Sequence, residues 1–240
     1  MRIIKPIPAD RIRLLIFDLD GTLVDSRIDL SNSVNAMLRH YSKPELPCDV
    51  IAGYIGDGAP MLVRRALGDP DEEPYVAEAL NFFLGHYREH KLDNTYVYAG
   101  VKDALQSLRA RRNGPGAAFR MAVLSNKPVR PTEQILEALG LADFFFRVYG
   151  GNSFHTKKPD PLGIQTLLAE SGAKPDEAVI IGDSDIDVIT GRNAGVWTVG
   201  VAYGFVPHTL EAAPPDVLVD SPAEWASLLQ STTETPRHRG

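Results

Sequence analysis

Short apolar runs alternate along the chain with stretches in which apolar positions recur at helical spacing. The clearest runs occupy residues 12–17, 119–124, 179–181 and 196–201, and polar residues or glycine follow each of them. Such runs are typical of strands that are buried on both faces. Because strands that alternate with helices form a parallel sheet covered by those helices, we expect an α/β fold.

One long segment departs from this alternation. Residues 28–90 contain no comparable apolar run, and their apolar positions recur at helical spacing, as in Val34, Met37 and Leu38 and again in Leu62, Val63 and Leu67. A helical block that interrupts an α/β pattern is most simply an inserted cap domain. We therefore expect a catalytic core over residues 1–26 and 97–230, a helical cap over 27–96, and a disordered polar tail over 231–240.

Composition narrows the cellular setting and the partners. The 240 residues carry a formal net charge of −6 and a single cysteine, Cys48, so no intrachain disulfide can form. No apolar run approaches the roughly 20 residues that a membrane helix needs. We expect a soluble cytoplasmic protein that binds neither nucleic acid nor membrane, since both require basic surfaces. An anionic substrate would have to meet local cations.

Two carboxylates directly follow the first predicted strand. Asp18 and Asp20 are separated by one residue, so in extended backbone their side chains project from the same face. Open α/β sheets bind ligands at this end of their strands. A calcium loop also begins with such a pair, but its sixth position needs glycine where this chain has Leu23, and its twelfth usually has glutamate where this chain has Asp29. A solvated acidic turn is the commoner origin of an isolated pair, so other strand ends must support a site.

Three further segments supply that support. Ser125 and Asn126 follow the second predicted strand, where a hydroxyl and an amide can hold phosphate oxygens. Lys157 and Lys158 precede Pro159, and the residue before proline favours extended backbone. Adjacent side chains then point to opposite sides, so only one of these lysines can enter a site. The acidic segment 182–187 follows the third predicted strand, although some of its carboxylates could simply cap a helix.

Together these segments carry a family resemblance. The order Asp18-x-Asp20-Gly21-Thr22, Ser125-Asn126, Lys158-Pro159 and Gly182-Asp183-x-x-x-Asp187 resembles the four motifs of the haloacid dehalogenase superfamily. That resemblance implies a Rossmann-like core with a helical cap inserted after the first motif. Within the superfamily the chain is similar to the phosphoglycolate phosphatase branch, in the segments 25–26, 54–58, 98–101, 150–151, 157–159 and 203–204.

The resemblance implies a role for each core motif residue. Asp18 would be the nucleophile and a Mg²⁺ ligand, and Asp20 would be the general acid and base, with its backbone carbonyl on the metal. Asp183 would be a direct metal ligand. Asp187 would lie behind it and hold Lys158 or a bound water.

The expected substrate contacts come partly from the core and partly from the cap. Lys158, which immediately precedes the proline, would bind the transferring phosphate together with Thr22, Ser125 and Asn126. In the cap, Arg65 follows a glycine-rich segment and is the best candidate to meet a substrate carboxylate, although a solvated helix face would place an arginine there equally well.

The implied function is Mg²⁺-dependent hydrolysis of a small phosphorylated metabolite, best 2-phosphoglycolate, through a phospho-aspartate intermediate, by a monomer or homodimer. Pyrophosphate, a nucleotide or a sugar phosphate are alternative substrates. A phosphomutase similar to β-phosphoglucomutase is disfavoured because residues 27–30 lack the histidine of those relatives. A dehalogenase does not need Asp20, and a non-catalytic binding module would be expected to have lost an essential carboxylate or lysine.

Overall fold

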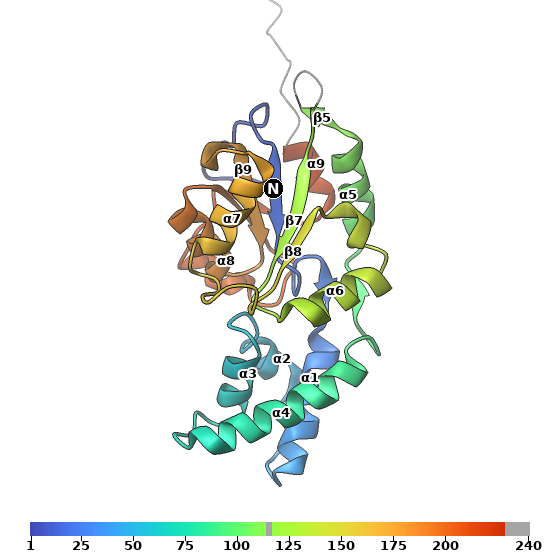
Figure 1. Cartoon of the computed structure of the whole chain (residues 1–240), viewed down its shortest axis with the longest axis vertical. Coiled ribbons are helices and arrows are strands. Elements are labelled where there is room, and N and C mark those ends of the chain that lie inside the picture. Colours follow the sequence, from blue (N-terminus) through green and yellow to red (C-terminus); the bar gives the residue numbers. More distant parts are fainter. Residues whose placement is uncertain (114–116, 229–240) are drawn as a thin grey trace, which may run out of the picture.

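The computed structural model describes residues 1–113 and 117–228. Figure 1 shows two parts, an α/β core and, below it, a cap made only of helices. This arrangement confirms the predicted fold class, a Rossmann-like core with an inserted helical cap. The tail expected to be disordered, 231–240, lies outside the described residues.

The core is built on a seven-stranded sheet with the order β1-β11-β10-β9-β2-β7-β8. All neighbours are parallel except β1, which runs antiparallel to β11 at the edge. The four predicted apolar runs form the contiguous centre, β10-β9-β2-β7. The strands are β1 (Arg2–Ile3), β2 (Leu14–Phe17), β7 (Arg120–Leu124), β8 (Arg147–Tyr149), β9 (Ala178–Gly182), β10 (Trp197–Val201) and β11 (Val217–Val219).

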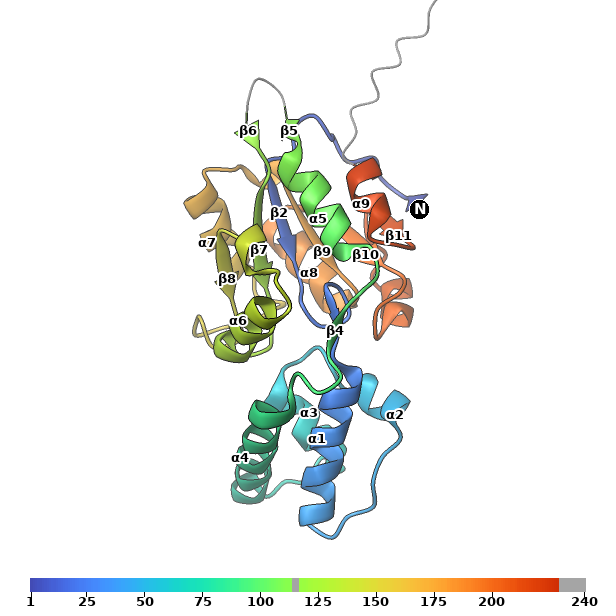
Figure 2. The ribbon, with the colours of Figure 1, turned by 90° about the vertical axis from the view of Figure 1, so that its right-hand side faces the viewer.

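Helices cover both faces of this sheet, as Figure 2 shows. Leu15 and Phe17 of β2 pack in one apolar cluster with α5, α6 and α9, whereas Leu14 and Ile16 pack in another with α7. Because side chains alternate along a strand, β2 contributes to both cores and its sequence is apolar throughout. The helices are α5 (Val101–Ala110), α6 (Val129–Ala138), α7 (Leu162–Ser171), α8 (Asp185–Ala194) and α9 (Ala223–Leu228), with 3-10 turns at Ala142–Phe144, Pro175–Glu177 and Pro207–Glu211.

The cap has a hydrophobic core of its own. It consists of α1 (Arg27–His40), α2 (Cys48–Ala52), α3 (Ala59–Ala66) and α4 (Glu73–His90). The six apolar positions that predicted helices here are all buried, and they pack with Phe83 and Tyr87 of α4. The hydrophobic cluster of the cap is therefore separate from the two clusters that cover the sheet. Within the described ranges, no helix combines the length and the apolar character needed to span a membrane.

The two connections between core and cap run side by side. β3 (Val24–Asp25) pairs antiparallel with β4 (Tyr96–Val97). The domain boundaries expected after residues 26 and 96 stay a prediction. Just inside the cap, the buried carboxylate of Asp29 accepts five hydrogen bonds from the backbone and side chains of Asn94 and Thr95. The first helix of the cap is thus tied to the segment that leaves it. The remaining short strands, β5 (Arg112–Asn113) and β6 (Ala117–Ala118), form a separate pair.

Candidate active site

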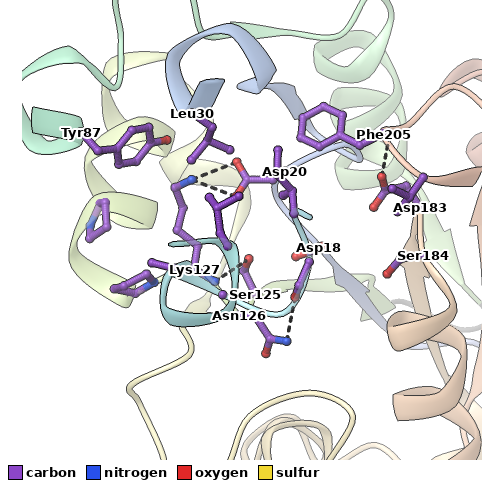
Figure 3. Close-up of a pocket in the computed structure, with 18 of the residues that line it drawn as sticks. Asp18, Asp20, Leu30, Tyr87, Ser125, Asn126, Lys127, Asp183, Ser184 and Phe205 are labelled. Atoms are coloured by element: carbon purple, nitrogen blue, oxygen red, sulfur yellow. Dashed lines mark hydrogen bonds and ion pairs between the residues drawn. The ribbon is translucent and has the colours of Figure 1, made fainter. Parts of the chain in front are cut away.

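The predicted site residues meet at the carboxyl ends of the central strands. Phe17 of β2 is in register with Val123 of β7 and Ile181 of β9, so the residues that follow these strands emerge at one edge of the sheet. A pocket opens there between the core and the cap, with about 700 Å³ of empty volume including the part open to solvent. Asp18, Asp20, Ser125, Asn126 and Asp183 all line it (Figure 3).

A cluster of three buried carboxylates lies at this edge. Asp18, Asp183 and Asp187 each place an oxygen within 4.8 Å of the oxygens of the other two. The backbone approaches this cluster very closely, because a Cβ atom on either Gly21 or Gly204 would collide with the carboxyl group of Asp183. Gly21 also has a left-handed φ of 80°, which side chains rarely permit. The glycine of the first motif is therefore required for the turn that brings Asp18 beside Asp183.

Lys158 is the cation of this cluster. Its Nζ lies 2.7 Å from Asp187 Oδ1 and 3.0 Å from Asp18 Oδ1, and the residue is only 4% exposed. Lys157 points away, is exposed, and donates a hydrogen bond to the backbone carbonyl of Asp57 in the cap. The structure thus brings the lysine immediately before the proline to Asp18, and directs its neighbour to the cap.

The cluster is strongly negative. Burial raises the pKa of Asp18 to about 6, with Lys158 opposing the rise and Asp187 adding to it. Burial also raises the pKa of Asp183 well above its usual range, reinforced by the charges of Asp187 and Asp18. Burial alone would lower the pKa of Lys158, but these carboxylates outweigh that effect and the net shift is upward. Carboxylates in this state favour any cation that can be placed among them.

A hard divalent cation fits this set of ligands. Both oxygens of Asp187 already have protein partners, because Oδ1 accepts from Lys158 and Oδ2 accepts from the Ser184 hydroxyl at 2.8 Å. Asp183 Oδ2 accepts from the backbone N–H of Phe205 at 2.7 Å, which orients the carboxylate. Asp18 and Asp183 are therefore the carboxylates that could hold a metal directly, and an oxygen-only site suits Mg²⁺.

The polar residues expected to bind phosphate divide into two groups. Ser125 and Asn126 line the pocket, and the Asn126 side-chain amide donates to the Gly56 carbonyl of the cap at 2.9 Å and to the Lys158 carbonyl at 3.0 Å. Thr22 is fully buried and does not line the pocket; its carbonyl accepts from the Tyr203 hydroxyl. The structure therefore does not bring the Thr22 hydroxyl to the substrate space.

Arg65 is also absent from the pocket lining formed by residues 1–113 and 117–228. Its guanidinium pairs with Asp57 at 2.6 Å and donates to the Tyr54 carbonyl at 3.3 Å. The glycine-rich segment before it does reach the pocket, through Ile55, Gly56 and Gly58. Arg65 thus holds the loop that lines the pocket, and the structure gives it no contact with the substrate space.

Lys127 is a site residue to which the sequence patterns assigned no role. Its Nζ lies 2.9 and 3.1 Å from the two carboxylate oxygens of Asp20 and 4.7 Å from the centre of the Tyr87 ring. Burial lowers the pKa of Lys127, but the charge of Asp20 and the contacts with Asp20 and Tyr87 together outweigh it, and the net shift is upward. Asp20 also accepts from the Ser26 hydroxyl at 2.5 Å. The available signal was its position two residues after Ser125, in the segment that directly follows β7.

Known proteins resemble this chain over almost its whole length. The family model of haloacid dehalogenase-like hydrolases matches residues 15–201. The phosphoglycolate phosphatase of Chromobacterium violaceum is 37% identical over 224 residues, covering 92% of this chain and 97% of that protein. That of Psychrobacter arcticus is 39% identical over 201 residues, covering 80% and 84%. The crystal structure of a predicted phosphoglycolate phosphatase from Haemophilus somnus has a TM-score of 0.84 and 29% identity, covering 92% and 99%.

Proposed function

The chain belongs to the haloacid dehalogenase-like hydrolases, and from that premise we propose that it is a Mg²⁺-dependent phosphatase of small phosphate monoesters, with 2-phosphoglycolate as its substrate. The observation that carries the proposal is the buried cluster of Asp18, Asp183, Asp187 and Lys158 beneath a pocket that Asp20 also lines. When ionised, the three carboxylates of this cluster and Lys158 leave two negative charges in excess, which one divalent cation balances.

Asp18 supplies the nucleophile. One of its carboxylate oxygens attacks phosphorus, the bond from phosphorus to the ester oxygen breaks, and Asp20 gives its proton to the leaving alkoxide. The products of this step are glycolate and a phospho-aspartate at residue 18. Asp20, now a carboxylate, then takes a proton from water, whose oxygen attacks phosphorus and breaks the bond to Asp18. Phosphate leaves, and both carboxyl groups return to their starting states.

The surrounding residues hold the phosphoryl group in place. Lys158, fixed by Asp187, lies 3.0 Å from Asp18 Oδ1 and would offset the negative charge that builds up on the phosphoryl oxygens. The Ser125 hydroxyl and the Asn126 segment line the same space. Mg²⁺ held by Asp18, Asp183 and the backbone carbonyl of Asp20 would neutralise charge on phosphate and carboxylate. The cap limits the access of water.

The choice of substrate rests on the relatives and on the pocket. The curated relatives at 37% and 39% identity are named phosphoglycolate phosphatases. The pocket lies between the core and the cap, and its cap wall is mostly apolar. Because the single Cys48 suits a reducing compartment, we place the enzyme in the cytoplasm, acting as a monomer or homodimer.

A substrate panel tests the proposal. Phosphate release is measured as kcat/KM for 2-phosphoglycolate, p-nitrophenyl phosphate, glucose 6-phosphate, a 5′-nucleotide and pyrophosphate, with Mg²⁺ or with a chelator. We expect 2-phosphoglycolate to give the highest value and the chelator to abolish all turnover. Turnover that persists in the chelator would contradict the metal dependence, and a higher value for another ester would contradict the substrate.

A further inference from the structure

Two donor groups of the pocket are not used by the chemistry described above. The Lys127 ammonium lies at the boundary between core and cap, held by Asp20 at 2.9 Å, and the Tyr87 ring of α4 packs 4.7 Å from it (Figure 3). Tyr87 is 4% exposed, and the described residues give its hydroxyl no hydrogen-bond acceptor. A buried hydroxyl without an acceptor is costly, so an acceptor from a ligand would stabilise this arrangement.

The rest of the cap wall offers a ligand no charge. Its other members are mostly apolar side chains: Leu30, Ile55, Ala59, Leu62, Phe83 and Leu84. Among the described residues that line the pocket, Lys127 is the one cation, since Lys158 lies beneath Asp18 and is not part of the lining. Among the described lining residues, Lys127 is therefore the one that offers a positive partner to an anionic group on the leaving part of a substrate.

We propose that Lys127 and Tyr87 form a subsite for a carboxylate on the carbon next to the ester oxygen, an inference that rests on the proposed phosphatase function. Asp20 protonates the ester oxygen, so that oxygen must bind beside Asp20. Lys127 hydrogen-bonds the same Asp20 carboxylate. In a 2-phospho-carboxylate a single carbon separates the ester oxygen from the carboxylate, which places the carboxylate within reach of both the Lys127 ammonium and the Tyr87 hydroxyl.

This subsite selects substrates by charge and by length. A phosphate ester with a neutral leaving group of the same size leaves Lys127 and Tyr87 without a substrate acceptor. A nucleotide or a sugar phosphate places hydroxyl groups against a cap wall whose side chains, among the described residues and apart from Tyr87, are apolar. The preferred class is therefore a short phosphate ester with an adjacent carboxylate.

The test compares 2-phosphoglycolate with 2-phosphoglycolamide, which has nearly the same shape and no carboxylate charge. The readout is the ratio of their kcat/KM values. We expect the wild type to prefer the acid by about 100-fold, as for a site built around a charged partner, and Lys127→Met to remove most of that preference. Tyr87→Phe keeps the ring and should lower the ratio by roughly 5-fold, because it removes one donor.

Lys43→Met is the matched control. Lys43 also lies over a cap tyrosine, 5.9 Å from the centre of the Tyr75 ring, but outside the pocket. The ratio of the kcat/KM values for acid and amide in Lys43→Met should equal that of the wild type. Equal losses for acid and amide in Lys127→Met would overturn the subsite and make Lys127 a positioning residue for Asp20, and an unchanged ratio in Tyr87→Phe would remove Tyr87 from it. Failure of the proposed function has a different signature, namely no Mg²⁺-dependent release from either ester by the wild type.

Discussion

Asp18 is a reactive group because burial and a neighbouring lysine shift its pKa in opposite directions. Burial raises the pKa of its carboxyl to about 6, yet Lys158 lies 3.0 Å away and favours the charged form. The carboxylate is therefore poorly solvated but still ionised near neutral pH. A nucleophile in this state is less shielded by water than a surface aspartate.

Replacing this carboxylate by its amide separates chemistry from folding. Asp18→Asn should lower kcat/KM for 2-phosphoglycolate by more than about 10³-fold, because an amide cannot form the phosphoenzyme. Its thermal midpoint without metal should equal or exceed that of the wild type, since a buried carboxylate with a raised pKa is destabilising at neutral pH. Turnover above about one per cent of wild type would contradict the proposed mechanism.

The adjacent lysines provide a sharper comparison. Lys158→Ala removes the cation shared by Asp18 and Asp187, and kcat/KM should fall by about 100-fold or more. The Lys157 side chain is exposed and donates a hydrogen bond to a cap carbonyl, so Lys157→Ala should lower kcat/KM by well under 10-fold. Both variants are assayed at saturating Mg²⁺. A larger defect in Lys157→Ala would show that the pre-proline lysine is not the one that serves the phosphate.

The positions of site residues could be predicted from the sequence where the course of the backbone alone determines them. Asp18, Asp183 and Ser125 follow apolar runs, and parallel register brings the ends of those runs together. Arg65 could not be placed in this way, because its direction depends on how α3 is rotated and on a loop with left-handed Gly56 and Gly58. Lys127 escaped prediction because its role depends on Tyr87, 40 positions earlier in the chain.

At the scale of elements, Asp29 joins the start of α1, where the chain enters the cap, to the segment before β4, where the chain leaves it. Its carboxylate is 1% exposed and accepts from Asn94 and Thr95. Asp29→Ala leaves these buried donors without a partner and should lower the free energy of unfolding by about 2 to 4 kcal/mol. The measurement is urea denaturation followed by circular dichroism.

Asp93→Ala is the control for this prediction. Asp93 lies in the same segment, but its side chain is 56% exposed and pairs with His90 at the surface. Its loss should change the free energy of unfolding by less than about 0.5 kcal/mol. Equal losses of unfolding free energy in the two variants would contradict the prediction, because they would show that the Asp29 hydrogen bonds stabilise the chain no more than the surface pair of Asp93 does.

The elements themselves differ in how readily the sequence reveals them. The central strands β2, β7, β9 and β10 are covered on both faces, so their sequences are apolar runs that cannot be mistaken for loops. The strands β1, β8 and β11 have only two or three residues each, and β1 is exposed while β8 and β11 are partly buried, which leaves no recognisable pattern. Such strands are specified by pairing with a sheet that already exists.

At the scale of the whole molecule, function depends on the cap meeting the core. The Asn126 amide donates to Gly56 of the cap and to the Lys158 carbonyl of the core, so one side chain joins the cap loop to the lysine segment of the site. Lys157 makes a second contact to the same loop, at the Asp57 carbonyl. The substrate space therefore takes its full form only when the cap loop rests on the core.

The buried carboxylates couple the stability of the whole chain to pH and to metal. Asp18 and Asp183 have pKa values raised above the unfolded value of about 4, so the native state binds more protons than the unfolded state. The contribution of these two groups to the free energy of unfolding of the metal-free protein should then be highest below about pH 4. It should fall as the pH rises through about 6.

Magnesium should reverse that loss. The cation binds the folded, deprotonated cluster, so protons compete with it, and the rise in thermal midpoint on adding Mg²⁺ should be large at about pH 8 and small at about pH 5. Differential scanning calorimetry with Mg²⁺ or with a chelator measures this directly and needs no substrate. Asp183→Asn should abolish the rise, whereas Asp185→Asn, a neighbour outside the carboxylate cluster at the start of α8, should keep it. A rise of equal size at both pH values would mean that the metal binds somewhere other than these buried carboxylates.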